Sequence, residues 1–150
     1  MIGHSGVCSS CDGRLTRLLT PSRGKPRVHT GFYNNFIYTI PYIRKYIIDK
    51  LLAKDGTPKK VYIVGCSLGG AIATMAYCFL LQELEDILSD PTFVNHKLIS
   101  VTAGAPRLCD PLMIDNVMKR LTKLRPLDRA VNYRLVYNHD LVSCVPFGSK

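Results

Sequence analysis

Acidic residues are scarce in this sequence of 150 residues, and several kinds of segment are missing from it. Asp and Glu number 11 against 20 Lys and Arg, so the net charge is +9, which favours anionic partners such as a phospholipid membrane surface. The basic residues are scattered, and a solvated surface is the simpler interpretation. No nucleic-acid-binding motif accompanies the charge, so no nucleic-acid partner is expected. We see no internal repeat and no low-complexity tract, and one domain of ordinary size is expected.

The first thirty residues lack the apolar core of a secretory signal, so a cytoplasmic or peripheral membrane location is expected. Residues 1–27 are rich in Gly, Ser, Pro and Arg, and they predict an irregular or disordered arm ahead of a domain over residues 28–150. Cys8 and Cys11 form one C-x-x-C pair in this arm. No second pair and no H-x-x-x-H completes a zinc site, so neither a metal nor a cofactor is predicted.

Residues 61–81 contain no charged residue, and their length alone would let a helix cross a bilayer. The first of these residues are mostly β-branched, however, and Gly65, Gly69 and Gly70 cluster around Ser67. Each glycine costs about 1 kcal/mol relative to alanine inside a helix. A buried strand, a turn and a helix account for all of these residues, whereas a single membrane helix accounts for none of the glycines. The membrane span stays open as an alternative.

The turn in this stretch reads Gly65-Cys66-Ser67-Leu68-Gly69, which is the G-x-S-x-G spacing of a nucleophilic serine. Such a serine occupies a strained turn between a strand and a helix, and small residues two positions before and after it let the two elements approach closely. The Ser67 hydroxyl would project at the end of the strand. The Leu68 N–H, at the start of the helix, would then donate to an oxyanion.

Strands and helices alternate along the rest of the chain. A helix is expected over residues 33–54, where Ile40, Ile43, Ile47 and Leu51 form one apolar stripe, with Pro41 as a kink or as the start of its main part. Alternation of this kind predicts parallel β-α-β units and an α/β fold. Buried strands are expected at residues 61–65, 97–104 and 131–138, and further helices at residues 71–88 and from 111 to about 120.

Four stretches together resemble the class 3, or fungal-type, lipases of the α/β-hydrolase fold: VHTGFYNNF (28–36), VYIVGCSLGGAIA (61–73), VTAGAPRLCDP (101–111) and NYRLVYNHDLVSCVPF (132–147). The resemblance implies a partial α/β-hydrolase domain, a mostly parallel sheet with helices on its faces. It also implies a serine hydrolase that acts on lipid carboxylic esters through an acyl-enzyme. In that family pattern Ser67 is the nucleophile, the Leu68 N–H is an oxyanion donor, and Asp140 is the carboxylate that orients the catalytic histidine.

Parts of the family pattern are absent from this sequence. The family's histidine follows the aspartate, and no histidine lies between Asp140 and Lys150. Residues 1–27 hold no counterpart to the strand and loop that carry the family's other oxyanion donor. Cys66 stands where the family usually has histidine, and it is interpreted as a packing change that points into the fold. The chain alone is therefore expected to be impaired as an enzyme, and the strand before Ser67 is expected at an unpaired edge.

Two alternatives stay open. His29 could act as the base, because triads recur in different chain orders. His139 is adjacent to Asp140 and should point the other way in an extended chain, and His96 precedes a strand at the wrong edge of the sheet. The other alternative is a non-catalytic lipid-binding or partner-binding remnant of a lipase domain. No oligomeric state is predicted.

Overall fold

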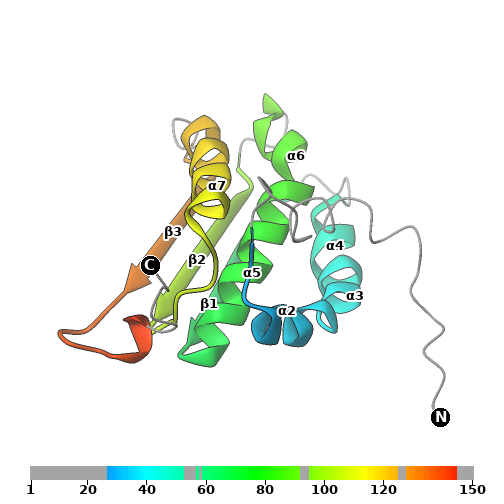
Figure 1. Cartoon of the computed structure of the whole chain (residues 1–150). Coiled ribbons are helices and arrows are strands. Elements are labelled where there is room, and N and C mark those ends of the chain that lie inside the picture. The colour runs from blue at the N-terminus through cyan, green and yellow to red at the C-terminus, as the bar shows by residue number, and fades with distance from the viewer. Residues whose placement is uncertain (1–26, 53–56, 58, 92–94, 125–127, 145–150) are drawn as a thin grey trace, which may run out of the picture.

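The structure is a computed structural model that describes residues 27–52, 57, 59–91, 95–124 and 128–144. The predicted arm at residues 1–27 and the Cys8–Cys11 pair lie almost wholly outside the described residues. Figure 1 shows the order of the elements: α2 (Thr30–Ile37), α3 (Ile40–Ile43), a π-helical turn (Arg44–Ile48), α4 (Asp49–Leu52), β1 (Lys60–Cys66), α5 (Leu68–Glu83), α6 (Glu85–Ser89), β2 (Lys97–Ala103), α7 (Pro111–Leu124), β3 (Ala130–Leu135) and a 3-10 turn (Val142–Cys144).

A parallel sheet of three strands, in the order β1-β2-β3, forms the centre of the fold. Ile63 is paired with Ser100, and Ser100 in turn with Asn132, so all three strands end at the same edge. Helices α5 and α7 connect successive strands, which confirms the predicted α/β class and the mostly parallel sheet. Within the described residues β1 pairs with β2 alone, as expected of an edge strand.

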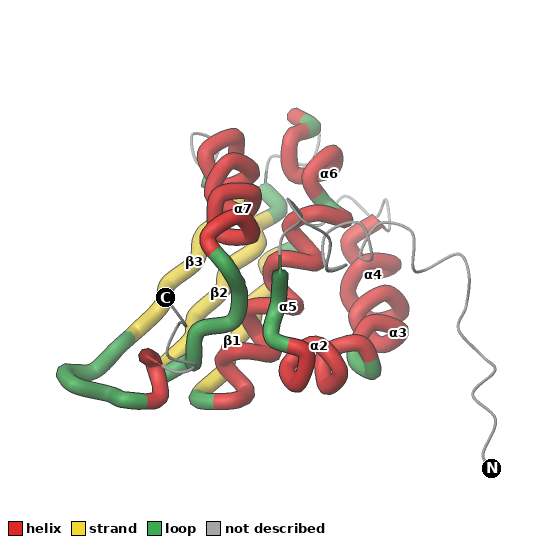
Figure 2. Tube along the Cα trace, viewed as in Figure 1, coloured by secondary structure: helices red, strands yellow, loops and turns green. Residues whose placement is uncertain are grey.

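Helix α5 lies between the sheet and α2, where it contacts β1, β2 and α2 (Figure 2). It has no charged residue before Glu83, and a helix that is apolar all round is one that packs on every side. Tyr77, Leu80 and Leu81 are accordingly 0% exposed. The core of the domain is therefore built around the helix that begins just after Ser67.

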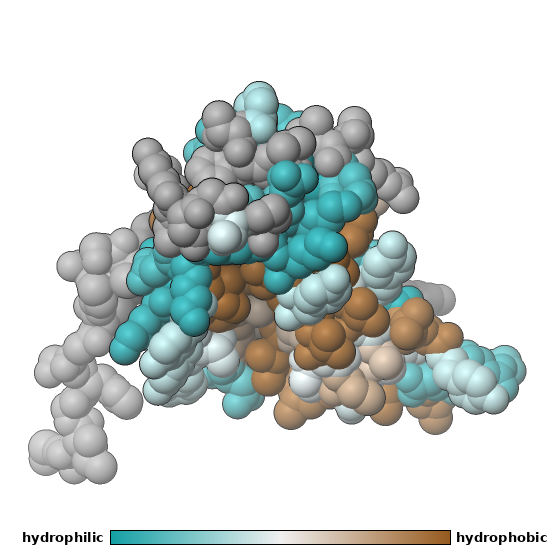
Figure 3. Space-filling view, turned by 180° about the vertical axis from the view of Figure 1, so that it is seen from behind, coloured by the Kyte–Doolittle hydropathy of each residue, from teal (hydrophilic) through white to brown (hydrophobic). Residues whose placement is uncertain are grey.

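The two faces of the sheet differ in what covers them. Ile63 and Leu98 point toward the helices and are buried, whereas Val64 is 73% exposed and Leu135 is 57% exposed on the opposite face. Figure 3, which views the molecule from behind, shows apolar side chains gathered on that side. The prediction of fully buried strands is therefore wrong for one face. The described helices pack only on the face of Ile63 and Leu98. An unbroken apolar run has the same appearance in sequence whether one face of the strand is covered or both.

The helical segment ahead of β1 is built in pieces. It begins at Thr30, three residues earlier than predicted. Pro41 lies in the first turn of α3 and so starts the main part, as one of the two predictions had it. The π-helical turn adds a residue to the spacing, so Ile48 is buried where the helical pattern predicted Ile47. The predicted end of the helix, at residue 54, lies outside the described residues.

Candidate active site at the carboxyl end of the sheet

Ser67 lies on a sharp turn between β1 and α5. Its φ of 51° and ψ of −126° place it in a region that non-glycine residues rarely occupy. The Ser67 amide donates to the Ala103 carbonyl at 2.9 Å, and the Ser67 carbonyl accepts the Gly70 amide at 2.9 Å. Residues 61–81 are thus a strand, a turn and a helix rather than one membrane helix. In the described part of the chain, every helix is too short or too polar to cross a bilayer.

The turn depends on glycine where β1 and α5 meet. A Cβ on Gly65 would lie 2.3 Å from the Gly69 carbonyl oxygen, so the strand and the helix can approach this closely only without a side chain there. A Cβ on Gly69 itself would meet nothing within 4 Å. A Cβ on Gly70 would lie 2.7 Å from the Ala105 Cβ. Sequence reasoning grouped Gly70 with its neighbours but assigned it no contact, because Ala105 is distant in the chain.

Leu68 opens α5, a helix of 16 residues, directly after the serine. Its amide lies in the first turn, where no carbonyl of the same helix precedes it as an acceptor. The positive end of the helix dipole lies at the same place. A backbone donor and a partial positive charge therefore directly follow Ser67, and such a pair can stabilise negative charge.

Asp140 follows β3 at the same edge of the sheet. Its carboxylate Oδ1 accepts the Val142 amide at 3.0 Å, and its own amide donates to the Tyr137 carbonyl at 3.0 Å. Gly104, at the end of β2, has a φ of +55°, and a Cβ there would lie 2.9 Å from Asp140 Oδ2. The carboxylate thus rests over the end of the middle strand, and Ser67 follows the neighbouring strand.

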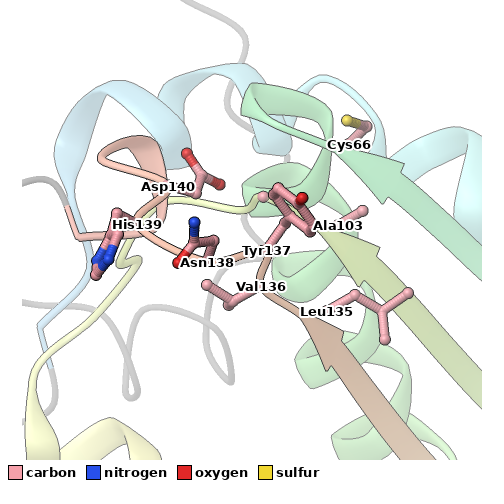
Figure 4. A pocket seen from close by; sticks show the side chains of 9 residues that line it. Cys66, Ala103, Leu135, Val136, Tyr137, Asn138, His139 and Asp140 are labelled. Atoms are coloured by element: carbon pink, nitrogen blue, oxygen red, sulfur yellow. The ribbon is translucent and has the colours of Figure 1, made fainter.

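A pocket of about 710 Å³ opens beside this carboxylate. Cys66, Ala103 and Leu135 line it from the sheet, and residues 136–140 line it from the loop after β3 (Figure 4). Cys66 is exposed, so the expectation that it points into the fold is wrong. Strand alternation puts Cys66 on the same face as Val64, which the described helices leave uncovered.

The described histidines are separated from the Asp140 carboxylate or turned away from it. His139 lines the same pocket, but its ring and the carboxylate point in different directions (Figure 4). His29 donates its amide to the Leu108 carbonyl and packs its ring against Phe32, with centroids 4.6 Å apart. His96 is buried just before β2, at the amino-terminal end of the strands, whereas Asp140 lies at their carboxyl end. Of the described histidines, none has a recorded hydrogen bond to this carboxylate, and His4 is not described.

Two of the cysteines are structural. Burial raises the pKa of the Cys78 thiol to about 12 and that of Cys109 to about 11, so both stay protonated at neutral pH. They act as small apolar side chains. Over the described ranges, no three His, Cys, Asp or Glu side chains come together as a metal site.

Comparison with known proteins gives one family. Residues 5–150 match the model of the family Lipase (class 3). Lipase II from Rhizopus niveus is 26% identical with a TM-score of 0.62, over 85% of this chain and 42% of its own. The lipase from Rhizopus microsporus var. chinensis is 26% identical with a TM-score of 0.64, over 85% of this chain and 39% of its own. The Rhizomucor miehei lipase propeptide complex is 26% identical with a TM-score of 0.62, over 83% of this chain and 35% of its own.

The chain therefore spans about two fifths of the length of the two Rhizopus lipases. No curated protein matches it at a significant level of sequence similarity.

Proposed function

Because the chain belongs to the class 3 lipase family, we propose that it hydrolyses carboxylic esters of lipids, with Ser67 as the nucleophile. The observation that carries this proposal is the strained Ser67 backbone between β1 and α5, with a φ of 51°. Ser67 Oγ attacks the ester carbonyl carbon, the alcohol leaves, and the acyl group stays on the serine. Water then attacks the acyl-enzyme, which releases the fatty acid and restores the hydroxyl.

The Leu68 amide serves as one oxyanion donor in this proposal. Negative charge develops on the carbonyl oxygen in both steps, and a backbone donor fixed in place stabilises it without reorganising. The start of α5 supports this role, because the helix dipole favours negative charge there. Since Leu68 acts through its backbone, its side chain can vary without loss of the donor.

Asp140 serves to orient the base that takes the serine proton. A serine hydroxyl is a weak nucleophile until such a base lies within hydrogen-bond reach. The position of the carboxylate over Gly104, beside the strand that leads to Ser67, supports this role. His139 turns its ring away from Asp140, and His96 lies at the opposite end of the strands, so this polypeptide should turn over slowly by itself. Imidazole added to the solution should raise the rate by supplying the base.

Hydrolysis of p-nitrophenyl butyrate tests the proposal. The rate is measured with and without imidazole, after subtraction of the hydrolysis caused by imidazole alone. We expect an imidazole-dependent rate that disappears in Ser67→Ala. Ser89→Ala, which alters an exposed serine at the end of α6, should keep the full rate. Equal rates for the Ser67→Ala and unmodified proteins would contradict the proposal.

A second function follows from the uncovered face of the sheet. Val64 and Leu135 are exposed on this face, Leu135 also lines the pocket, and the chain carries a net charge of +9. Both features suit a non-catalytic module that binds lipid at an anionic surface. Sedimentation with anionic vesicles separates the two functions. Binding that weakens with salt, together with an absence of Ser67-dependent hydrolysis, would favour this one.

A further inference from the structure

Ser67 and Asp140 follow different strands, β1 and β3. Their separation must therefore be set by the segments that carry them. Arg134, on β3, joins the turn after Asp140 to the loop after β2 through one atom, and that loop packs on the first turn of α5. Its Nη2 donates to the Ala105 carbonyl at 2.7 Å and to the Ser143 carbonyl at 2.9 Å. Ala105 belongs to the loop after β2, and Ser143 to the turn after Asp140.

The Ser143 end of this bridge leads directly to the carboxylate. Ser143 is 5% exposed, and its Oγ donates to the Asp140 carbonyl at 2.7 Å. One residue earlier, the Val142 amide donates to Asp140 Oδ1 at 3.0 Å. The Ser143 side chain and the Val142 amide of this short turn thus hold Asp140 at two points. A shift of the Ser143 carbonyl would move the carboxylate with it.

The Ala105 end leads to the serine. Ala105 is 1% exposed, and its Cβ packs so closely on the first turn of α5 that a Cβ on Gly70 would lie 2.7 Å away. The Gly70 amide donates to the Ser67 carbonyl. Next to Ala105, Gly104 leaves the room that Asp140 Oδ2 occupies. Ala105 is therefore in contact with the Ser67 turn on one side and bonded to Arg134 on the other.

We propose that Arg134 is a positioning residue for ester hydrolysis, because it holds the Ala105 and Ser143 carbonyls together and so fixes the Asp140 carboxylate relative to the Ser67 hydroxyl. The inference rests on the function proposed for Ser67 and Asp140. A guanidinium suits this task because its donors are rigidly placed, whereas an ammonium is a single point on a flexible stem. Misplacement of a catalytic group by about 1 Å can cost on the order of 100-fold in rate.

Five variants test the proposal in the imidazole-dependent hydrolysis assay. Arg134→Met should lower the rate roughly tenfold or more, and Arg134→Lys should lower it less, because lysine keeps a donor. Arg107→Met removes an exposed arginine from the same loop as Ala105 and should keep the full rate. In a chain that already carries Asp140→Asn, Arg134→Met should cause no further loss, because its effect passes through that carboxylate.

The combination with Asp140→Asn separates positioning from general support of the fold. A loss from Arg134→Met that is as large with asparagine at position 140 as with aspartate would overturn the proposal. So would an unchanged rate in Arg134→Met.

Amide hydrogen exchange tests the bridge without any chemistry at Ser67. Arg134→Met should speed exchange at the Val142 and Cys144 amides and leave the middle of α5 unchanged. If hydrolysis never depends on Ser67, the proposed function fails, and the exchange result still decides whether Arg134 holds the loop. Unchanged exchange at these two amides would overturn the proposal. If Arg134→Met does not fold, Arg134→Lys carries both measurements.

Discussion

The two faces of the sheet carry similar apolar side chains, but the described helices cover only one of them. On one face Ile63 is 8% exposed and Leu98 is 1% exposed, whereas on the other Tyr62 is 61% exposed and Val64 is 73% exposed. The difference follows from topology. Both crossovers step in the same direction along the sheet, from β1 to β2 to β3, and crossovers of the same right hand put their helices on the same face. The covered face holds the fold together, and the other face ends in the pocket beside Asp140.

The largest effect on stability is expected at Gly65, where β1 and α5 are in very close contact. Gly65→Ala would bring a Cβ to 2.3 Å from the Gly69 carbonyl oxygen, which belongs to the backbone and cannot move alone. We expect the free energy of unfolding to fall by about 3 kcal/mol or more, measured by urea denaturation. Gly69→Ala is the control, because its Cβ meets nothing within 4 Å, and it should stay within about 1 kcal/mol of the unmodified chain. Equal stability of the two variants would mean that β1 and α5 are not in close contact.

A pair of neighbouring substitutions on β1 compares the two faces directly. Ile63→Ala opens a cavity under α5 and should lower the free energy of unfolding by about 3 kcal/mol. Val64→Ala removes a side chain that is 73% exposed and should lower it by less than about 1 kcal/mol. Both free energies of unfolding are measured by urea denaturation under the same conditions. Similar losses at the two positions would show that something covers both faces in solution.

A smaller effect distinguishes the faces without changing stability. Cys66 is exposed on the uncovered face, whereas burial raises the pKa of the Cys78 thiol on α5 to about 12. At pH 8 the reactive thiolate of Cys78 should amount to on the order of one molecule in ten thousand. Iodoacetamide should therefore alkylate Cys66 in the folded chain and Cys78 only in urea, as read by peptide mass spectrometry. Alkylation of both at equal rates in the folded state would contradict this assignment of the faces.

The sequence predicted the features that depend on neighbours in the chain. The turn at Ser67 follows from a β-branched run, the spacing of Gly65 and Gly69, and an apolar helix afterwards. The helix predicted from residue 111 begins at Pro111, directly after Asp110, whose Oδ1 accepts the Met113 amide at 2.9 Å. The alternation of strands and helices likewise determined the α/β class.

Features that depend on tertiary contacts could not be predicted in the same way. Cys66 lies on the uncovered face because of how the strands are connected, and an apolar run carries no sign of this. Arg134 reaches Ala105 from 29 residues away, and nothing in the local pattern marks it. The role of Gly104 could not be predicted either, because it consists of leaving space for the Asp140 side chain, which is distant in the sequence.

The most direct test of the account is where a fluorophosphonate probe attaches to the folded chain, since such probes bond to activated serines. With imidazole present, we predict that peptide mass spectrometry finds the probe on Ser67 and that labelling disappears when the chain is unfolded in urea. Labelling spread over several serines, or equal in the folded and unfolded chains, would contradict the claim that the turn after β1 activates this hydroxyl.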